Sequence, residues 1–223
     1  MSAVLIIPAS GRGRRMGQDK LFADVGGRPL MAHTLAAAAA SKTFDRVVIA
    51  APQDRHELIA ALAGDAGFAE VVLTTGGTRR QDSVRLALEH VGDADVVAVH
   101  DAARPLCAPQ LFIDCVSVAR RHGAATVAMP VVDSIKRGAG GVIVQSLDRH
   151  DLYAIQTPQA FRRELLVEGH RHATANALVV DDDAVLVEAL GTAVHIVPGS
   201  PDNFKVTHPR DLLLLRALLA GGA

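Results

Sequence analysis

Short apolar runs alternate along the chain with longer segments in which apolar residues recur at helical spacing. The short runs, rich in β-branched residues, predict strands over residues 4–7, 46–50, 70–73, 96–99, 125–129 and 193–197. The longer segments predict helices over residues 29–40, 54–62, 80–91, 109–121 and 208–219. Strands that alternate with helices pair in parallel, and nearly continuous apolar strands indicate a sheet covered on both faces. We therefore predict a three-layer α/β/α sandwich around a mostly parallel, Rossmann-like sheet.

One stretch, residues 133–155, interrupts this alternation. Its glycine-rich centre, Gly138-Ala139-Gly140-Gly141, separates two alternating runs at residues 134–136 and 142–145, a pattern typical of a β-hairpin. We expect residues 133–155 to project as an arm from a single domain that spans residues 1–223.

Composition narrows the functional class. The 223 residues are 49% hydrophobic and 21% charged, which is the balance of a soluble globular protein. A net charge of −1, the lack of Trp and a 3% aromatic content argue against nucleic-acid binding. The apolar run at residues 3–7 is too short for a membrane span or a secretory signal. Cys107 and Cys115 lack metal-type spacing and indicate free thiols, so we expect a cytoplasmic location.

Candidate chemistry gathers in the segments that follow predicted strands, because ligands of such sheets bind beyond the carboxyl ends of the strands. This rule selects residues 8–20, 74–83, 100–105 and 129–136. The first segment contains Gly11-Arg12-Gly13-Arg14-Arg15-Met16-Gly17-Gln18-Asp19-Lys20. Glycines let backbone N–H groups approach phosphate oxygens, and the arginines and the lysine add positive charge. A polyanion is the ligand that this combination predicts.

Two common phosphate loops do not match this segment. Met16 stands where a dinucleotide fingerprint has its third glycine, and Gln18-Asp19 stands where a Walker A loop has Lys-Ser/Thr. From these residues alone, a triphosphate cradle and a solvated basic loop both remain open.

Further motifs follow in a fixed order. They are Gly76-Gly77-Thr78-Arg79-Arg80-Gln81-Asp82-Ser83-Val84, Val99-His100-Asp101-Ala102-Ala103-Arg104-Pro105, Asp133-Ser134-Ile135-Lys136, Gln156-Thr157-Pro158-Gln159, Asp182-Asp183-Ala184 and Phe204-Lys205-Val206-Thr207. With the first loop, this series covers nearly the whole chain. It resembles the 2-C-methyl-D-erythritol 4-phosphate cytidylyltransferase family, among the nucleotidyltransferases that activate sugar or polyol phosphates.

The resemblance implies a reaction. It is the transfer of a cytidylyl group from CTP to 2-C-methyl-D-erythritol 4-phosphate, which gives 4-diphosphocytidyl-2-C-methyl-D-erythritol and pyrophosphate for isoprenoid precursors. Such a reaction needs positioning and charge stabilisation at the α-phosphate, and it needs no covalent intermediate.

The family pattern also implies site residues. The implied catalytic cations are Arg15 and Lys20. The implied CTP-binding residues are Ala9, Ser10, Gly11, Gly13, Gly76, Gly77, Ser83, Asp101 and Ala102. The implied acceptor-binding residues are Arg104, Ser134, Arg149, Thr157 and Lys205. Asp101 is also a candidate ligand for Mg²⁺ or another divalent cation. In the family the arm of one subunit reaches the active site of the other, so a homodimer through the arm is implied.

Plainer interpretations stay open for several of these residues. Ser83, Asp82 and Asp101 suit helix or turn caps, and Arg149 suits an exposed arm. Asp19 precedes Lys20 where the family often has Pro, Ser10 stands where alanine is common, and the run Asp181-Asp182-Asp183 suits a helix start. His33, His56, His90, His122, His170 and His172 read as residues on helix surfaces.

Two other functions remain as alternatives. A ribitol 5-phosphate cytidylyltransferase would share the CTP loop, and a nucleotide-binding regulatory module would bind CTP without turnover.

Overall fold

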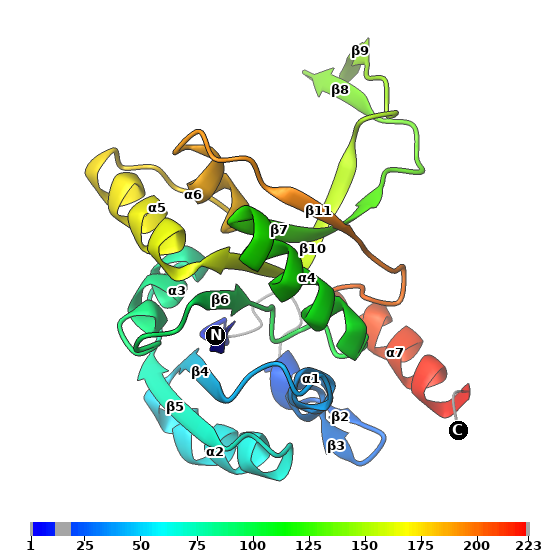
Figure 1. Ribbon diagram of the computed structural model, residues 1–223. Helices are drawn as coiled ribbons and strands as arrows, with labels where there is room; N and C mark the ends of the chain where they lie inside the picture. Colours follow the sequence, from blue (N-terminus) through cyan, green and yellow to red (C-terminus); the bar gives the residue numbers. More distant parts are fainter. Residues whose placement is uncertain (1, 12–18, 222–223) are drawn as a thin grey trace.

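A seven-stranded sheet forms the centre of the computed structural model, which describes residues 2–11 and 19–221 (Figure 1). Its strands are β1 (Ala3–Pro8), β4 (Arg46–Ala51), β5 (Glu70–Thr75), β6 (Val96–Val99), β7 (Ala124–Pro130), β10 (Tyr153–Arg162) and β11 (His195–Pro198). The order across the sheet is β11-β7-β10-β6-β1-β4-β5. Only β10 runs antiparallel to its neighbours in this sheet, β6 and β7. The predicted mostly parallel α/β/α class is therefore confirmed.

Helices cover both faces of the sheet. They are α1 (Leu30–Ala40), α2 (His56–Asp65), α3 (Arg80–Leu88), α4 (Pro109–His122), α5 (Arg163–Ala175), α6 (Ala184–Glu188) and α7 (Pro209–Gly221). Two short 3-10 turns, η1 (Lys20–Phe22) and η2 (Gln53–Arg55), follow the first loop and β4.

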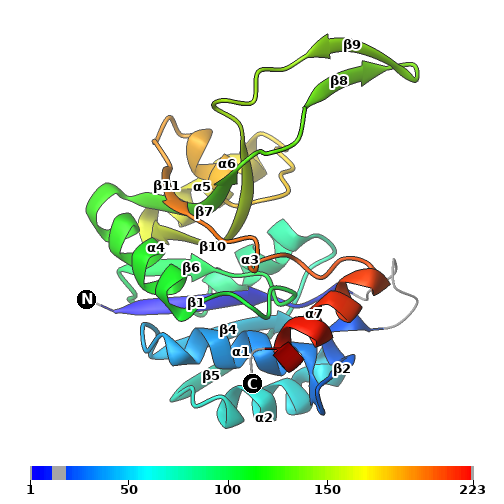
Figure 2. The same ribbon diagram turned by 90° about the vertical axis from the view of Figure 1, so that its right-hand side faces the viewer.

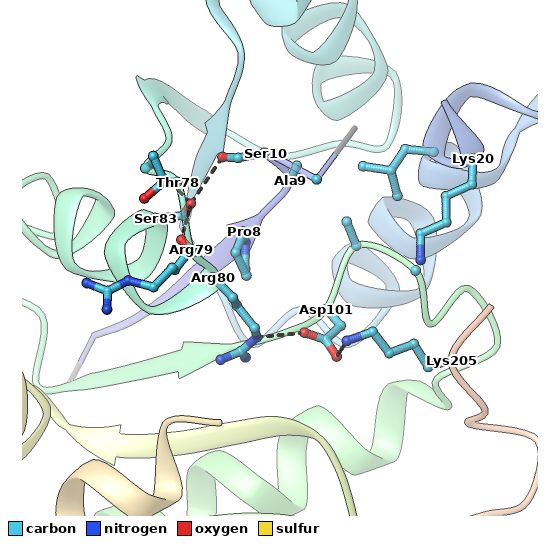
Figure 3. Close-up of a pocket in the computed structure, with 15 residues that line it drawn as sticks. Pro8, Ala9, Ser10, Lys20, Thr78, Arg79, Arg80, Ser83, Asp101 and Lys205 are labelled. Carbon is cyan, nitrogen blue, oxygen red and sulfur yellow. Dashed lines mark hydrogen bonds and ion pairs between the residues drawn. The ribbon is translucent and has the colours of Figure 1, made fainter. Parts of the chain in front are cut away.

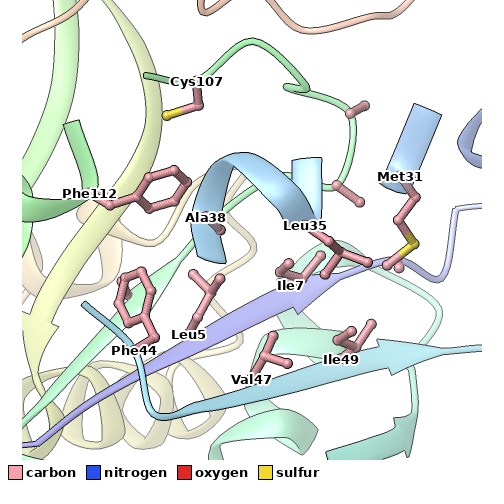
Figure 4. Packing of buried hydrophobic residues seen from close by; sticks show 14 of the residues in the cluster. Leu5, Ile7, Met31, Leu35, Ala38, Phe44, Val47, Ile49, Cys107 and Phe112 are labelled. Atoms are coloured by element: carbon pink, nitrogen blue, oxygen red, sulfur yellow. The ribbon is translucent and has the colours of Figure 1, made fainter. Parts of the chain in front are cut away.

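Alternate residues of β1 divide the core into two layers. Leu5 and Ile7 belong to the core cluster formed with α1, α2, α4 and α7 (Figure 4). Val4 and Ile6 belong to the cluster formed with α3, α5 and α6. Successive strand side chains point to opposite faces, so a strand that is apolar at every position needs helices on both sides. The unbroken apolar run at the N-terminus thus specified a central strand.

The sequence pattern missed some elements. No strand was predicted at the position of β10, because a proline within an extended run argues against a central strand. In the structure a register shift between Ile155 and Gln159 accommodates that segment between β6 and β7. No residue ranges were predicted for helices α5 and α6, although α6 begins directly after Asp181-Asp182-Asp183, the run that was interpreted as a helix start. A small hairpin, β2 (Asp24–Val25) and β3 (Arg28–Pro29), turns at Gly26 and Gly27, whose φ values of 62° and 81° favour glycine.

Some predicted helix boundaries were also wrong. Pro29 is the N-cap of α1 and pairs within the β2–β3 hairpin, so the helix begins one residue later than predicted. Helix α3 ends at Leu88, three residues before the predicted end at Val91. His170 of α5 is buried, at 4% exposure, which corrects its expected place on a helix surface.

The predicted hairpin is present as β8 (Lys136–Ala139) and β9 (Val142–Ser146). The hairpin projects from the ends of β7 and β10, away from the helical layers (Figure 2). All nine residues of its two strands are exposed. Its stability in a single chain therefore comes from strand pairing and its glycine turn, with no contribution from a core.

No helix among the described residues has the length and apolar content needed to cross a membrane.

Candidate functional site

A pocket opens at the carboxyl ends of β1, β5 and β6 (Figure 3). Its lining comprises Pro8, Ala9, Ser10, Gly11, Lys20, Leu21, Gly77, Thr78, Arg79, Arg80, Ser83, Asp101, Ala102, Ala103 and Lys205. Three of the four segments selected from the sequence thus meet here, as the rule for parallel sheets predicts. The fourth, residues 129–136, leads into the arm and lies outside this pocket.

Hydrogen bonds join the first loop to the loop after β5. The Ser10 hydroxyl donates to the carbonyl of Ala50 at 3.1 Å, and its oxygen lies 3.1 Å from Ser83 Oγ. The backbone N–H of Gly77 donates to Ser83 Oγ at 3.1 Å. Ser10 and Ser83 therefore fix the relative position of two loops that line the same pocket.

Two glycines in the second loop are required by close packing. A Cβ added at Gly76 would lie 1.5 Å from Ser10 Oγ, and one at Gly77 would lie 2.3 Å from the Cβ of Asp82. Neither contact is possible, so a side chain at position 76 would push the two loops apart, and one at position 77 would push the loop away from the start of α3. A Cβ at Gly11, by contrast, meets nothing within 4 Å among the described residues.

Asp82 caps the start of α3, as the plainer interpretation of this residue predicted. Its carboxylate accepts hydrogen bonds from the backbone N–H, Nε and Nη2 of Arg79, at 3.2, 2.9 and 2.9 Å. These bonds, chiefly those to the Arg79 side chain, lower the pKa of Asp82. Ser83, one residue further on, faces the first loop, as described above.

Asp101 lies at the centre of a cluster of cations. Its Oδ1 is 3.0 Å from Arg80 Nε, and its Oδ2 is 2.8 Å from Lys205 Nζ (Figure 3). Arg104 Nε lies 3.6 Å from the same Oδ2. Burial alone would raise the pKa of Asp101, but the charges of Arg80, Lys205 and Arg104 outweigh it and hold the pKa well below its usual range. The carboxylate is therefore ionised and oriented by several donors.

The backbone beside Asp101 is fixed from behind. The N–H of Asp101 donates to Thr157 Oγ1 at 3.0 Å, and this hydroxyl lies 3.0 Å from His100 Nδ1. His100 Nε2 lies 3.3 Å from the carbonyl of Arg104. A neutral His100 with its proton on Nε2 satisfies every one of these contacts, since the carbonyl can only accept. Burial lowers the pKa of His100 to about 4, which favours that neutral form.

Lys20 reaches the pocket from the first turn of η1. Its Nζ donates to the carbonyl of Val206 at 2.8 Å, so it contacts the segment that also carries Lys205. The neighbouring Asp19 has its Oδ2 3.7 Å from Arg55 Nη2, and the Arg55 guanidinium stacks 5.0 Å from the ring centroid of Phe22. The carboxylate at position 19 is thus paired with η2.

Two of the predicted residues, Gly13 and Arg15, lie outside the described residues. The other predicted residues of the first loop, Ala9, Ser10 and Gly11, line the pocket together with Lys20. Ala102 also lines it, and its carbonyl accepts a hydrogen bond from Thr34.

The predicted acceptor residues occupy three different places. Lys205 lines the pocket. Arg104 and Thr157 are buried beside it, where Arg104 Nη1 donates to the carbonyl of Asn203 at 2.6 Å. Ser134 and Arg149 are exposed on the arm, and Arg149 Nη1 donates to the carbonyl of Val132. One chain therefore does not bring all five together, and their contact with an acceptor stays a prediction.

Sequence reasoning assigned no site role to Arg80, Gln159 or Asn203, and it interpreted Asp183 chiefly as part of a helix start. Arg80 Nη1 donates to Asp183 Oδ2 at 2.7 Å, and the Asp183 side chain is 1% exposed. A cation in the first turn of a helix opposes the helix dipole, so an arginine there signals a carboxylate partner. That signal was present at residues 79–80, but the partner lies 103 residues away and only the fold identifies it.

Asp101 fits poorly as a ligand of a resident metal. Both of its carboxylate oxygens are within 3.0 Å of cationic nitrogens, and coordination would require it to release Arg80 or Lys205. No group of three or more His, Cys, Asp or Glu side chains suited to a metal occurs within residues 2–11 and 19–221. The Asp101 carboxylate is therefore already paired with side chains of the protein.

The fold and the pocket have the features of a nucleotidyltransferase: a mostly parallel sheet, a glycine-containing first loop and a cationic pocket at the strand ends. The family model for 2-C-methyl-D-erythritol 4-phosphate cytidylyltransferase matches residues 3–221. A relative of that name from Synechococcus sp. is 47% identical over 97% of this chain and 98% of its own length. Another, from Bacillus mycoides, is 40% identical over 96% of each chain.

Solved structures give the same result. The 2-C-methyl-D-erythritol 4-phosphate cytidylyltransferase of Thermus thermophilus superposes with a TM-score of 0.82 at 36% identity, over 99% of this chain and 100% of that one. The 4-diphosphocytidyl-2C-methyl-D-erythritol synthase of Anaerococcus prevotii gives a TM-score of 0.87 at 26% identity, over 98% of each chain. The chain belongs to the 2-C-methyl-D-erythritol 4-phosphate cytidylyltransferase family. The resemblance stated from the motifs is confirmed.

Proposed function

We propose that this protein transfers the cytidylyl group of CTP to 2-C-methyl-D-erythritol 4-phosphate in isoprenoid precursor biosynthesis. An oxygen of the acceptor phosphate forms a bond to the α-phosphorus of CTP. The bond from that phosphorus to the oxygen bridging the β-phosphate breaks, and pyrophosphate leaves with this oxygen. The observation that carries the proposal is the match to this family over residues 3–221, together with a pocket lined by Lys20, Arg79, Arg80 and Lys205.

The pocket's charge suits this reaction. Among its described lining residues, four carry positive charge and one, Asp101, carries negative charge. An excess of fixed cations stabilises negative charge that grows on the α-phosphate during transfer, and it needs no rearrangement when the charge appears. In this proposal Lys20 is the catalytic cation among the described residues, and Arg15 has the same role in the first loop.

The CTP base and triphosphate have separate candidate contacts. Gly77 and Ser83 line the pocket at the loop after β5, where the Gly77 backbone and the Ser83 hydroxyl are the proposed contacts for the base. Ser10 and Gly11 extend directly from β1 toward Lys20 and provide the phosphate side of the site. The proposed orientation therefore places the triphosphate along the first loop and leaves Lys205 to the acceptor phosphate.

The acceptor phosphate is proposed to bind Lys205 together with Arg149 of a second subunit. Arg149 lies on the exposed arm, outside the pocket of its own chain. The outer strand β9 exposes Val142, Ile143 and Val144 at 63%, 69% and 54%. Exposed apolar side chains on a projecting hairpin favour contact with another protein surface. A homodimer in which each arm completes the partner's site accounts for both observations.

The divalent cation and the cytoplasmic location remain parts of the proposal. We propose that Mg²⁺ arrives on the phosphates of CTP, because Asp101 is already occupied by cations. Buried free thiols at Cys107 and Cys115 suit a reducing compartment.

Pyrophosphate release tests the activity. We expect release from CTP with Mg²⁺ and 2-C-methyl-D-erythritol 4-phosphate, and a much lower kcat/KM with ribitol 5-phosphate. A preference for ribitol 5-phosphate would reassign the acceptor. CTP binding without turnover on either acceptor would instead support a regulatory module.

Complementation tests the shared site. Lys20→Ala and Arg149→Ala proteins, each assayed alone at low acceptor concentration, should be nearly inactive. Mixed dimers contain one site with both residues intact, so mixing should restore activity. A mixture no more active than its components, in a sample shown by sedimentation to contain mixed dimers, would exclude the shared site.

A further inference from the structure

Arg80 connects the pocket to a buried carboxylate outside it. Its Nε donates to Asp101 Oδ1 at 3.0 Å, and its Nη1 donates to Asp183 Oδ2 at 2.7 Å. Arg80 and Asp101 line the pocket, but Asp183 does not (Figure 3). Burial opposes the charge on Arg80, yet the carboxylates of Asp183 and Asp101 more than offset it and raise the pKa of Arg80. One guanidinium thus spans two carboxylates.

Strand β10 fixes both ends of this bridge. Gln159, which is fully buried, accepts a hydrogen bond from the backbone N–H of Asp183 at 2.9 Å. Thr157, two residues earlier on the same strand, accepts one from the backbone N–H of Asp101 at 3.0 Å. The separation of the two carboxylates is therefore set by the strand, and Arg80 is held at a defined place between them.

Asp101 has a second partner to which it could turn. Arg104 Nε lies 3.6 Å from Asp101 Oδ2 and makes no hydrogen bond with any described residue. Because Oδ1 is bonded to Arg80, the carboxylate keeps Oδ2 directed at Lys205 Nζ, 2.8 Å away. Without that bond, rotation toward Arg104 would satisfy a buried donor and release Lys205.

We propose that Asp183 is a positioning residue for the acceptor-phosphate subsite. It holds Arg80, Arg80 fixes the Asp101 carboxylate, and Asp101 holds the Lys205 ammonium at the pocket wall. The effect reaches the acceptor through three charged contacts, although Asp183 itself touches no substrate. This inference rests on the proposed function, in which Lys205 binds the acceptor phosphate.

Asp183→Asn tests the first link, because it keeps the shape of the side chain and removes its charge. Losing one charge-assisted hydrogen bond corresponds to a change of about tenfold or more in an equilibrium constant. We expect the KM for 2-C-methyl-D-erythritol 4-phosphate to rise about tenfold. The KM for CTP should stay within about twofold, because the loops at Ser10 and Ser83 do not contact Asp183. A purely structural role would weaken both substrates together.

Asp182→Asn is the matched control. Its Oδ1 accepts hydrogen bonds from the backbone N–H groups of Ala184 and Val185, at 2.9 and 3.4 Å, and from Gln159 Nε2 at 3.4 Å. An asparagine Oδ1 can accept the same three bonds, and position 182 does not bond to Arg80. Asparagine caps helices as well as aspartate does, so this variant removes an adjacent charge and keeps α6. Its acceptor KM should equal that of the wild type.

A double-mutant cycle tests whether Asp183 acts through Arg80. The acceptor KM of Arg80→Gln combined with Asp183→Asn should equal that of Arg80→Gln alone. An unchanged acceptor KM in Asp183→Asn, equal rises for both substrates, or additive effects in the double variant would each overturn the proposal.

If Asp183→Asn folds poorly, a second variant tests the same proposal. Arg80→Lys keeps the charge, but a single ammonium cannot span both carboxylates, so its acceptor KM should also rise. A wild-type acceptor KM in Arg80→Lys would overturn the proposal. Wild-type protein that fails to turn over the acceptor would refute the proposed function itself, so the two failures are distinguishable.

Discussion

His100 should make the folded state sensitive to acid. Its imidazole is fully buried between Thr157 and the carbonyl of Arg104, and burial lowers its pKa from 6.5 to about 4. Below pH 6.5 the unfolded chain therefore takes up a proton at this residue and the folded chain does not. The unfolded state binds more protons in this range, so the free energy of unfolding falls as the pH falls from 6.5 toward 4. Above pH 6.5 the contribution of His100 is fully present.

The two pKa values determine the size of the effect. Proton linkage at this one residue removes about 2 kcal/mol of unfolding free energy by pH ~5, and about 3 kcal/mol by pH ~4. For a domain of this length, a loss of 2 kcal/mol lowers Tm by about 4–8 °C. An extra proton on Nδ1 would face the Thr157 hydroxyl, which already accepts the N–H of Asp101, so acid should also disturb the pocket wall.

Other groups titrate in the same range, so the assay compares variants. Urea unfolding gives the free energy of unfolding of wild type and His100→Gln at each pH from ~8 to ~5. The contribution of His100 is the difference between the slopes of these two free energies against pH. Gln can donate to the Arg104 carbonyl but does not titrate. His150→Gln is the control variant, because it removes a histidine of the exposed arm without removing a core contact. Equal slopes for His100→Gln and wild type would refute the reasoning.

Three further predictions concern the pocket. Lys20→Ala should lower kcat by about 10²–10³-fold while the affinity for CTP changes little, because a cation that acts on developing charge contributes mainly in the transition state. Rapid-quench kinetics measure the loss in kcat, and CTP titration measures the affinity. Gly76→Ala should weaken CTP binding and lower the free energy of unfolding by about 1–3 kcal/mol or more, because its Cβ would meet Ser10 Oγ at 1.5 Å. In urea unfolding, adding Ser10→Gly should recover part of the lost free energy. Chelation of divalent cations should stop turnover and leave Tm unchanged, because the cation is proposed to arrive with CTP; a fall in Tm would instead indicate a metal bound by the protein.

The alternation of apolar runs determined most of the architecture. Buried strands with apolar side chains at every position, such as β1, are stable only between two helical layers, so the layered fold followed from local pattern. The hairpin at residues 136–146 was also visible, because its Gly140-Gly141 turn is a local signal.

The missed elements have physical reasons. Strand β10 depends on its place between β6 and β7, where neighbouring strands supply partners for a segment that looks irregular by itself. His170 appeared to be a surface residue because histidine is amphipathic, and only the packing of α5 against its neighbours buries it.

The sequence by itself determined which residue types meet at the strand ends, because the carboxyl ends of parallel strands share one edge of the sheet. It selected the segments that carry Ser10, Lys20, Ser83 and Asp101, and the family resemblance singled out these four residues within them. The tertiary structure alone decided which charges pair: Arg80 with Asp183 across 103 positions, and Asp101 with Lys205. Pairing depends on distances between side chains from separate elements, and no local pattern encodes those distances.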